Sequence, residues 1–296
     1  MMTGHLSAVA ASKLELSDRE RIRFIKSARW ISYPEAEAIL EQLEDLLDHP
    51  QQDRMPNMLL VGATNAGKTA LIKRFLSLHP AKPNLEGDAA EVPVGYVQTP
   101  PGATDDDLYQ AIQRTLFHST PRAQSRPERR NGAIDVMRDV GMRILLIDEV
   151  QHMLSATHTK QALFLNALKF ISNDLRISIV AAGPQEAVRA IHTDPHLANR
   201  FKPVVFPKWT LTEAFARLLV SFETVLPLRK PSNLGGKAMA KEVLRLSEGT
   251  IGEVSDLLNA AAIYAIKNKT EEITLDALKL CGFVQPSLRR QKASTL

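Results

Sequence analysis

The sequence has few of the features of secreted, disulfide-bonded or membrane-spanning proteins. Its one cysteine, Cys281, excludes an internal disulfide and is typical of a reducing cytoplasm. No apolar run reaches the roughly 18 residues of a transmembrane helix. Residues 1–16 are of mixed polarity and include Lys13 and Glu15, so no signal peptide is expected. The eight histidines are scattered and do not have the spacing of zinc ligands.

Aromatic residues are also few, at 5%, but a hydrophobic content of 44% in 296 residues is sufficient for one large domain or two smaller ones. The net charge of +4 is modest, and its distribution is uneven. Residues 35–53 carry seven acids and no Lys or Arg, whereas residues 114–130 carry five arginines against Glu128 alone. This asymmetry favours binding of a polyanion to one surface.

Residues 62–69 read Gly-Ala-Thr-Asn-Ala-Gly-Lys-Thr and follow the apolar run 58–61. This is the pattern of a P-loop between a strand and a helix, in which main-chain N–H groups and the helix dipole hold phosphates. The lysine reaches the β- and γ-phosphates, and the threonine hydroxyl is a ligand for Mg²⁺. The alternative is a glycine-rich turn with an incidental lysine. We expect ATP and Mg²⁺ to be bound by Gly62, Ala63, Thr64, Asn65, Ala66, Gly67, Lys68, Thr69 and Ala70.

A second motif follows the apolar run 144–147, which ends in Asp148 and Glu149. A strand buried on both faces is typical of parallel sheets, whose carboxyl ends bind ligands. We expect Asp148 to support Mg²⁺ and Glu149 to polarise the water that attacks the γ-phosphate. Taken alone, the motif is equally compatible with a strand that ends in a solvated turn.

Apolar periodicity divides the chain into an α/β part and an all-helical part. Strands are expected at 58–61, 92–97, 144–147, 177–182 and 204–206. The helices between them are expected at 68–78, 105–117, about 131–140, about 160–172 and 185–192. This alternation predicts a parallel five-stranded sheet covered by helices. Helices are expected at 18–26, 36–47, 211–225, 237–246, 252–267 and 275–282, after a flexible segment 1–17. Thr210 and Glu213 are expected to form a capping box. The predicted parts are an N-terminal leader with helices (1–50), a nucleotide-binding core (51–208), a helical lid (209–285) and a basic tail (286–296).

A P-loop, a strand that ends in Asp-Glu and a C-terminal helical lid together resemble the AAA+ ATPases. Within that class the chain is similar to the TniB proteins of bacterial transposons, relatives of TnsC and MuB, over about residues 20–283. The similarity lies in four segments. These are Arg29-Trp30-Ile31-x-Tyr33, the strand and P-loop 57–69 with Asn57 and Asn65, Phe75 with His79-Pro80, and Val97-Gln98-x-Pro100.

The resemblance implies a bacterial cytoplasmic, nucleoid-associated protein that binds ATP and Mg²⁺. It would form rings or helical filaments on double-stranded DNA and deliver that DNA to a DDE-type transposase, and a target-selector protein is a further candidate partner. In Asn199-Arg200-Phe201, the last two residues match the Arg-Phe pair that supplies an arginine finger to a neighbouring subunit. The alternative is that Arg200 forms a surface ion pair. The segment with Trp30 and Ile31 would enclose the adenine, although Trp30 as a core anchor is an equal alternative. Gly252 lies in the lid motif, which also contacts nucleotide in relatives.

Two positions depart from the family pattern. Ala182-Gly183-Pro184 offers no polar side chain where relatives carry a sensor residue, and Glu253 stands where relatives often carry an arginine that touches the γ-phosphate. We therefore expect nucleotide binding and assembly to persist and hydrolysis to be slow or dependent on a partner.

The arginine-rich stretch 118–130 contains Pro121 and Pro127, which predicts a loop or a broken helix. In AAA+ rings the loops of this region line the pore, so DNA contacts are expected from Arg122, Arg126, Arg129, Arg130 and, after the next strand, Lys160. Such contacts would be to phosphates and independent of base sequence. A solvated loop is the alternative.

These observations favour an ATP-dependent DNA-binding regulator of transposition. An AAA+ protein remodeller is a second hypothesis, but the candidate pore segments are basic and nearly free of the aromatic residues that grip polypeptide. A signalling ATPase that does not act on DNA is a third. An ATP-dependent shift of duplex DNA separates the first hypothesis from the third.

Overall fold

The computed structural model describes residues 4–84, 89–116 and 124–294, which fall into two compact units. Residues 38–206 form the α/β unit, and residues 1–37 cluster with residues 207–296 in the helical unit. The expected leader, 1–50, is therefore divided between the two units, and the boundary lies within helix α3 (Pro34–Leu47). The two units are described separately below.

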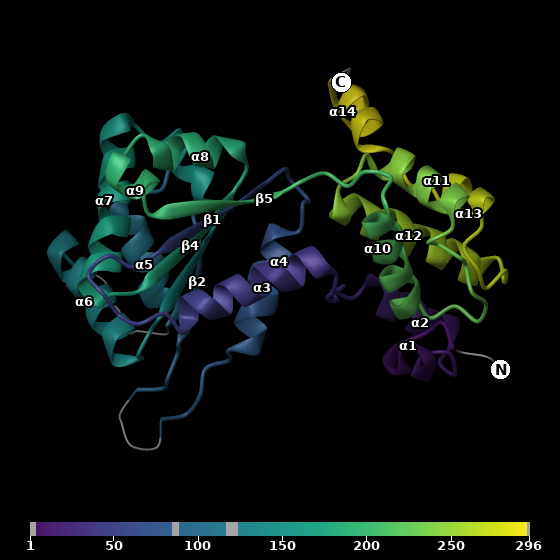
Figure 1. Ribbon diagram of the computed structural model, residues 1–296, viewed down its shortest axis with the longest axis horizontal. Helices are drawn as coiled ribbons and strands as arrows, with labels where there is room; N and C mark the ends of the chain where they lie inside the picture. The colour runs from purple at the N-terminus through teal and green to yellow at the C-terminus, as the bar shows by residue number, and fades with distance from the viewer. Residues whose placement is uncertain (1–3, 85–88, 117–123, 295–296) are drawn as a thin grey trace. The chain divides into compact units, whose positions relative to one another are not determined.

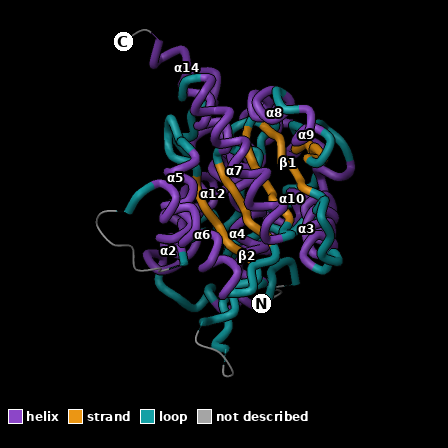
Figure 2. The backbone as a smooth tube through the Cα atoms, turned by 90° about the vertical axis from the view of Figure 1, so that its left-hand side faces the viewer, coloured by secondary structure: helices purple, strands orange, loops and turns teal. Residues whose placement is uncertain are grey.

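The α/β unit contains one parallel five-stranded sheet of order β2-β3-β4-β1-β5. Figure 1 shows the strands among their helices, and Figure 2 shows them in orange, running side by side. This confirms the fold class expected from the alternating pattern. The strands are β1 (Asn57–Gly62), β2 (Val94–Gln98), β3 (Ile144–Asp148), β4 (Ser178–Gly183) and β5 (Phe201–Phe206).

Helices cover both faces of this sheet, because β1, β3 and β4 are buried along their whole length. One face packs on a cluster that includes Leu59, Ile147 and Ile179 together with side chains of α5, α6, α7 and α8. Helix α4 contacts β1, β2 and β4, and its buried residues lie outside that cluster, so it covers the other face. The helices of this unit are α4 (Lys68–Leu78), α5 (Asp105–Thr115), α6 (Arg126–Asp139), α7 (His158–Leu175), α8 (Gln185–His192) and α9 (Pro195–Ala198), with the 3₁₀ segment η1 (Val150–Ser155).

The prediction of a loop or broken helix through residue 130 is wrong for residues 126–130, which form the first turn of α6. Ser125 caps this helix, because its hydroxyl accepts from the main chain of Glu128 while the Glu128 side chain accepts from Ser125. Pro127 lies in the first turn, where its missing N–H is not needed. The capping box and the proline at this position therefore start a helix.

The helical unit joins the N-terminal segment to the C-terminal helices. Its helices are α1 (Ala8–Ser12), α2 (Asp18–Lys26), α10 (Glu213–Val225), α11 (Lys237–Ser247), α12 (Ile251–Lys267), α13 (Leu275–Leu280) and α14 (Pro286–Ser294). The buried Arg21 of α2 donates to the main-chain oxygen of Pro227 at 2.7 Å and forms an ion pair with Glu271. Trp209 stacks edge-on against Tyr33, with ring centroids 5.4 Å apart.

Two local expectations in the helical unit are corrected by the structure, and a third is described more fully. The expected flexible segment 1–17 contains helix α1, which Ser7 caps by accepting from the main chain of Ala10. The cap of α10 is Thr212 rather than Thr210, because the Thr212 hydroxyl accepts from the main chain of Phe215. The expected basic tail 286–296 is helical through Ser294.

Candidate nucleotide site

The loop between β1 and α4 is placed at the carboxyl edge of the sheet. Gly67 has φ 95° and begins α4, and Asn65 has φ 62°, so two residues of the loop adopt left-handed conformations. A Cβ on Gly62 would lie 2.8 Å from the Cβ of Phe206 on the adjacent β5, so only glycine fits there. A loop with left-handed residues that opens a helix turns successive N–H groups toward one point, which suits a phosphate group.

Lys68 is nearly buried, and its ammonium group lies inside this loop. The Nζ atom donates to the main-chain oxygens of Gly62 at 2.7 Å and Ala63 at 3.0 Å. Burial lowers the pKa of Lys68, while the negative charges of Glu149 and Asp148 act in the opposite direction. An anion bound in the loop would favour the charged form of this lysine, so the side chain is suited to a phosphate.

The two residues expected to support Mg²⁺ are in direct contact. The Thr69 hydroxyl donates to Oδ2 of Asp148 at 2.7 Å, and Oδ1 of Asp148 accepts from the main chain of Glu149 at 2.9 Å. Asp148 is 2% exposed, at the carboxyl end of β3. A hydroxyl and a carboxylate oxygen fit Mg²⁺, which takes few protein ligands and completes its shell with water and phosphate oxygens. Among the residues that the structure describes, no group of three or more Asp, Glu, His or Cys side chains could hold a metal ion by itself. A Mg²⁺ ion that takes ligands from Thr69, Asp148, water and phosphate does not require such a group.

Glu149 has a left-handed main chain, with φ 55°, at the turn between β3 and η1. Its carboxylate accepts a hydrogen bond from the side-chain amide of Gln151. The amide oxygen of Gln151 is buried and has no hydrogen-bond partner among the residues that the structure describes. It lies 2.7 Å from the position that a Cβ on Gly183 would occupy. Sequence reasoning missed Gln151, because a glutamine two residues after a carboxylate is not a motif by itself.

Arg200 lies at the opposite edge of the same sheet. It directly precedes β5, its main-chain oxygen accepts from Asn57 at the start of β1, and its side chain donates to Asn173 at 2.6 Å. Because Asn57 and Gly62 are the two ends of β1, Arg200 is separated from its own phosphate loop by about 17 Å of strand. The geometry excludes a role for Arg200 at the phosphates of its own subunit.

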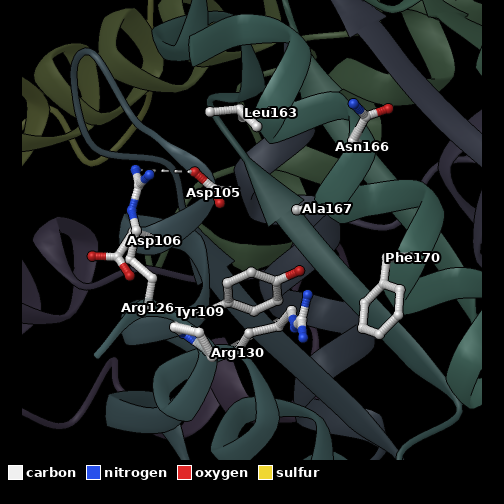
Figure 3. Close-up of a pocket in the computed structure, with 10 residues that line it drawn as sticks. Asp105, Asp106, Tyr109, Arg126, Arg130, Leu163, Asn166, Ala167 and Phe170 are labelled. Atoms are coloured by element: carbon white, nitrogen blue, oxygen red, sulfur yellow. Dashed lines mark ion pairs between the residues drawn. The ribbon is translucent and has the colours of Figure 1, made fainter. Parts of the chain in front are cut away.

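The expected DNA-contacting arginines have contacts within the chain. Arg129 forms an ion pair with Asp106, Arg126 lies 3.7 Å from Asp105, and Arg130 stacks on the ring of Phe170, as Figure 3 shows for the last two. Arg126 and Arg130 line a pocket of about 290 Å³ between α5, α6 and α7, and both are exposed, whereas Arg129 is partly buried. Lys160 is exposed in the first turn of α7, and Arg122 lies outside the described residues. Contact of these residues with DNA stays a prediction.

Trp30, Ile31 and Gly252 belong to the helical unit, so their expected contacts with nucleotide also stay predictions. Trp30 is partly buried, and its indole nitrogen has no hydrogen-bond partner in the described part of the chain. Glu253, beside Gly252, is buried and forms an ion pair with Arg289.

No helix within the described residues is long and apolar enough to cross a bilayer.

Solved structures with this fold include one that was determined in complex with DNA. The ORC1 protein of Aeropyrum pernix, solved in complex with DNA, has a TM-score of 0.58 and 21% identity, covering 90% of this chain and 69% of its own. Cdc6p of Pyrobaculum aerophilum has a TM-score of 0.59 and 18% identity, covering 84% and 67%. RuvB of Thermotoga maritima has a TM-score of 0.51 and 15% identity, covering 83% and 67%. At these identities the likeness shows the fold, which is that of the AAA+ P-loop ATPases.

No curated protein matches the sequence. Residues 21–211 match the family described as bacterial TniB protein, and this segment includes the phosphate loop, Asp148, Glu149 and Arg200. The match covers more than half of the chain. The chain therefore belongs to the TniB family, and its fold is that of the AAA+ P-loop ATPases.

Proposed function

We propose that this protein is an ATP-dependent regulator of transposition that assembles on duplex target DNA and delivers it to a DDE-type transposase. The observation that supports this proposal is the separation of Arg200 from the phosphate loop of its own subunit. A cation and a phosphate loop at opposite edges of one sheet can meet only between two copies of the chain. Nucleotide bound at Lys68 and Thr69 then joins one subunit to the next in a ring or a helical filament.

Within each subunit the residues have separate tasks. Main-chain N–H groups of the loop and Lys68 bind the phosphates, and Thr69 and Asp148 hold Mg²⁺. The metal ion supplies charge neutralisation for the triphosphate when it is bound. Glu149 accepts a proton from the attacking water, and the guanidinium of a neighbouring Arg200 stabilises the charge that develops on the γ-phosphate.

Hydrolysis is proposed to be slow, because two polar contacts of related proteins have no counterpart here. Ala182-Gly183-Pro184 presents no side-chain donor at the end of β4, and Glu253 carries a negative charge where relatives carry an arginine. A rate of many turnovers per second by the purified protein with DNA would contradict this proposal.

Binding of duplex DNA is proposed to use phosphate contacts from Arg122, Arg126, Arg129, Arg130 and Lys160. Contacts of this kind position the protein without reading base sequence, and they weaken steeply as salt rises. The ORC1 protein of similar fold was solved in complex with DNA, which is consistent with this use of the fold. A target-selector protein and the transposase are the proposed protein partners.

The experiment is electron microscopy of the full chain with a nonhydrolysable ATP analogue, with and without duplex DNA. Lys68→Ala removes a charge-assisted contact to phosphate, and loss of such a contact lowers nucleotide affinity by about 10- to 150-fold. The matched control is Lys73→Ala, on the exposed face of the same helix α4. We expect polymers on DNA for the wild type and the control and none for Lys68→Ala. Polymers formed by Lys68→Ala, or a wild type that stays monomeric with nucleotide and DNA, would refute the proposal.

A further inference from the structure

A second basic site lies at the amino edge of the sheet, around Arg200. The residues before β1 and those around the start of β5 line a hollow of about 330 Å³. Its charged side chains are Arg54, Arg200 and Lys202, and no acidic residue is among the described residues that line it. The other lining residues are Met55, Pro56, His196 and Asn199.

The strand order explains why these cations meet, although they are far apart in the sequence. β1 and β5 are parallel neighbours, and Asn57 pairs with Phe201 in register. Arg54 precedes the first residue of β1 by three positions, and Arg200 precedes the first residue of β5 by one. The two arginines therefore lie at the same edge of the sheet. Lys202 is the second residue of β5. The sequence pattern alone does not indicate this cluster, because its members belong to two separate segments.

The charges in this hollow are not compensated by ion pairs within the described part of the chain. In residues 4–84, 89–116 and 124–294, no ion pair involves Arg54, Arg200 or Lys202. By contrast, the nearby Asp53 lies 3.0 Å from Arg176, so the one acid next to Arg54 is engaged elsewhere. Three like charges around one hollow repel each other, and an anion placed among them relieves that repulsion.

We propose that this hollow receives the terminal phosphates of the nucleotide held by a neighbouring copy of the chain, with Arg54 and Lys202 acting beside Arg200. The inference rests on the proposed assembly and adds two residues, Arg54 and Lys202, to the interface that Arg200 forms with the neighbouring nucleotide. A compact phosphate group suits cations that converge on one hollow, whereas the phosphates of a duplex extend along a strand and require a stripe of cations. The hollow binds the γ-phosphate, so a neighbouring subunit that holds ADP provides no ligand for it.

The first test compares the full-length double variant Arg54→Ala/Lys202→Ala with the wild type. Binding of a fluorescent ATP analogue is measured on dilute monomer, and assembly on duplex DNA is measured by sedimentation with the nonhydrolysable analogue. We expect unchanged binding by the monomer, whose own phosphate loop is intact, and at least a tenfold higher protein concentration for half-maximal assembly. The matched control is Arg176→Ala, an arginine that already has a carboxylate partner, and we expect it to assemble as the wild type does.

The second test mixes the double variant with Lys68→Ala. The first retains its phosphate loop and the second retains its basic hollow, so together they provide one complete interface. We expect the mixture to form dimers in the presence of the ATP analogue, at concentrations where neither variant associates alone. Fluorescence energy transfer between two labelled variants measures this pairing.

The outcomes distinguish the inference from the proposed function on which it rests. A wild type that does not assemble overturns both. A wild type that assembles, with a double variant that assembles equally well, overturns this inference alone. A double variant that assembles normally but releases DNA at lower salt also overturns it, because the hollow then contacts DNA. Absence of dimers in the mixture, while the wild type assembles, overturns the placement of Arg54 and Lys202 across the interface.

Discussion

The ion pair between Arg21 and Glu271 gives a sharp prediction about the stability of the helical unit. The Arg21 guanidinium is 1% exposed, and it donates to the Glu271 carboxylate and to the main-chain oxygen of Pro227. Glu271→Ala leaves a buried cation with that carbonyl and with Asp18, whose side chain is 42% exposed and compensates weakly. Loss of one partner of a buried pair costs about 3–5 kcal/mol, and we expect about 3 kcal/mol here.

The assay is urea unfolding of the full chain followed by tryptophan fluorescence. Both tryptophans, Trp30 and Trp209, belong to the helical unit, so their emission reports on that unit. A loss of about 3 kcal/mol lowers the urea midpoint by roughly 1–2 M. The control is Glu272→Ala, which removes an exposed pair with Lys230, 3.7 Å away, and costs about 1 kcal/mol or less.

The destabilisation caused by Glu271→Ala is expected to depend on pH, in a direction set by the pKa of Glu271. Burial raises the pKa of Glu271, but the hydrogen bond and charge of Arg21 outweigh it, so the pKa lies below the ordinary value. A carboxylate with a lowered pKa stabilises the folded state above the pKa of the unfolded chain, and this contribution is lost as the pH falls through the folded value. The difference between wild type and Glu271→Ala is therefore constant near neutrality and shrinks below about pH 4. An equal effect of the two alanine variants, or a difference that grows in acid, would refute the reasoning.

Three further predictions concern single positions. Gly62→Val weakens nucleotide binding at least tenfold by equilibrium titration, because a Cβ there would meet Phe206 at 2.8 Å; unchanged affinity contradicts the close approach. Gln151→Ala lowers kcat about tenfold with unchanged nucleotide affinity, because Glu149 loses the amide that positions it, and Gln151→Asn restores part of the rate; equal rates for all three proteins exclude this role. Gly249→Ala destabilises the helical unit by 1 kcal/mol or more in urea unfolding, because the residue has φ 79° and a Cβ would lie 2.6 Å from a main-chain oxygen; a stable variant contradicts this strain.

Four strands and most helices of the α/β unit were predictable, because these strands contain short apolar runs and most helices have an apolar face. The fifth strand begins at Phe201, three residues before the expected 204–206, because Lys202 and Pro203 interrupt its apolar run. Helix α4 begins and ends where the periodicity places it, at Lys68 and Leu78. The start of α6 was missed because proline was interpreted only as a helix breaker, whereas in the first turn it is compatible with a helix. The Ser125–Glu128 capping box was the signal that could have corrected this interpretation.

The candidate site was predictable only where its residues are close in the sequence. The loop 62–70 and the pair at 148–149 are contiguous motifs, and the structure brings Thr69 and Asp148 into contact. The basic hollow depends instead on the pairing of β1 with β5, which periodicity does not determine. Long-range contacts of this kind depend on strand order, and a single sequence carries little information about it.

The grouping of residues 1–37 with residues 207–296 has a consequence for synthesis of the chain on the ribosome. The α/β unit is contiguous, so it can fold as soon as residue 206 has emerged. The first 37 residues are made earliest, yet the helices that bury Ile25 and Arg21 are made last. At bacterial-type elongation rates of 5–20 residues per second, this segment waits roughly 10–50 s for its packing partners. During that interval it is a natural substrate for chaperones that bind nascent chains.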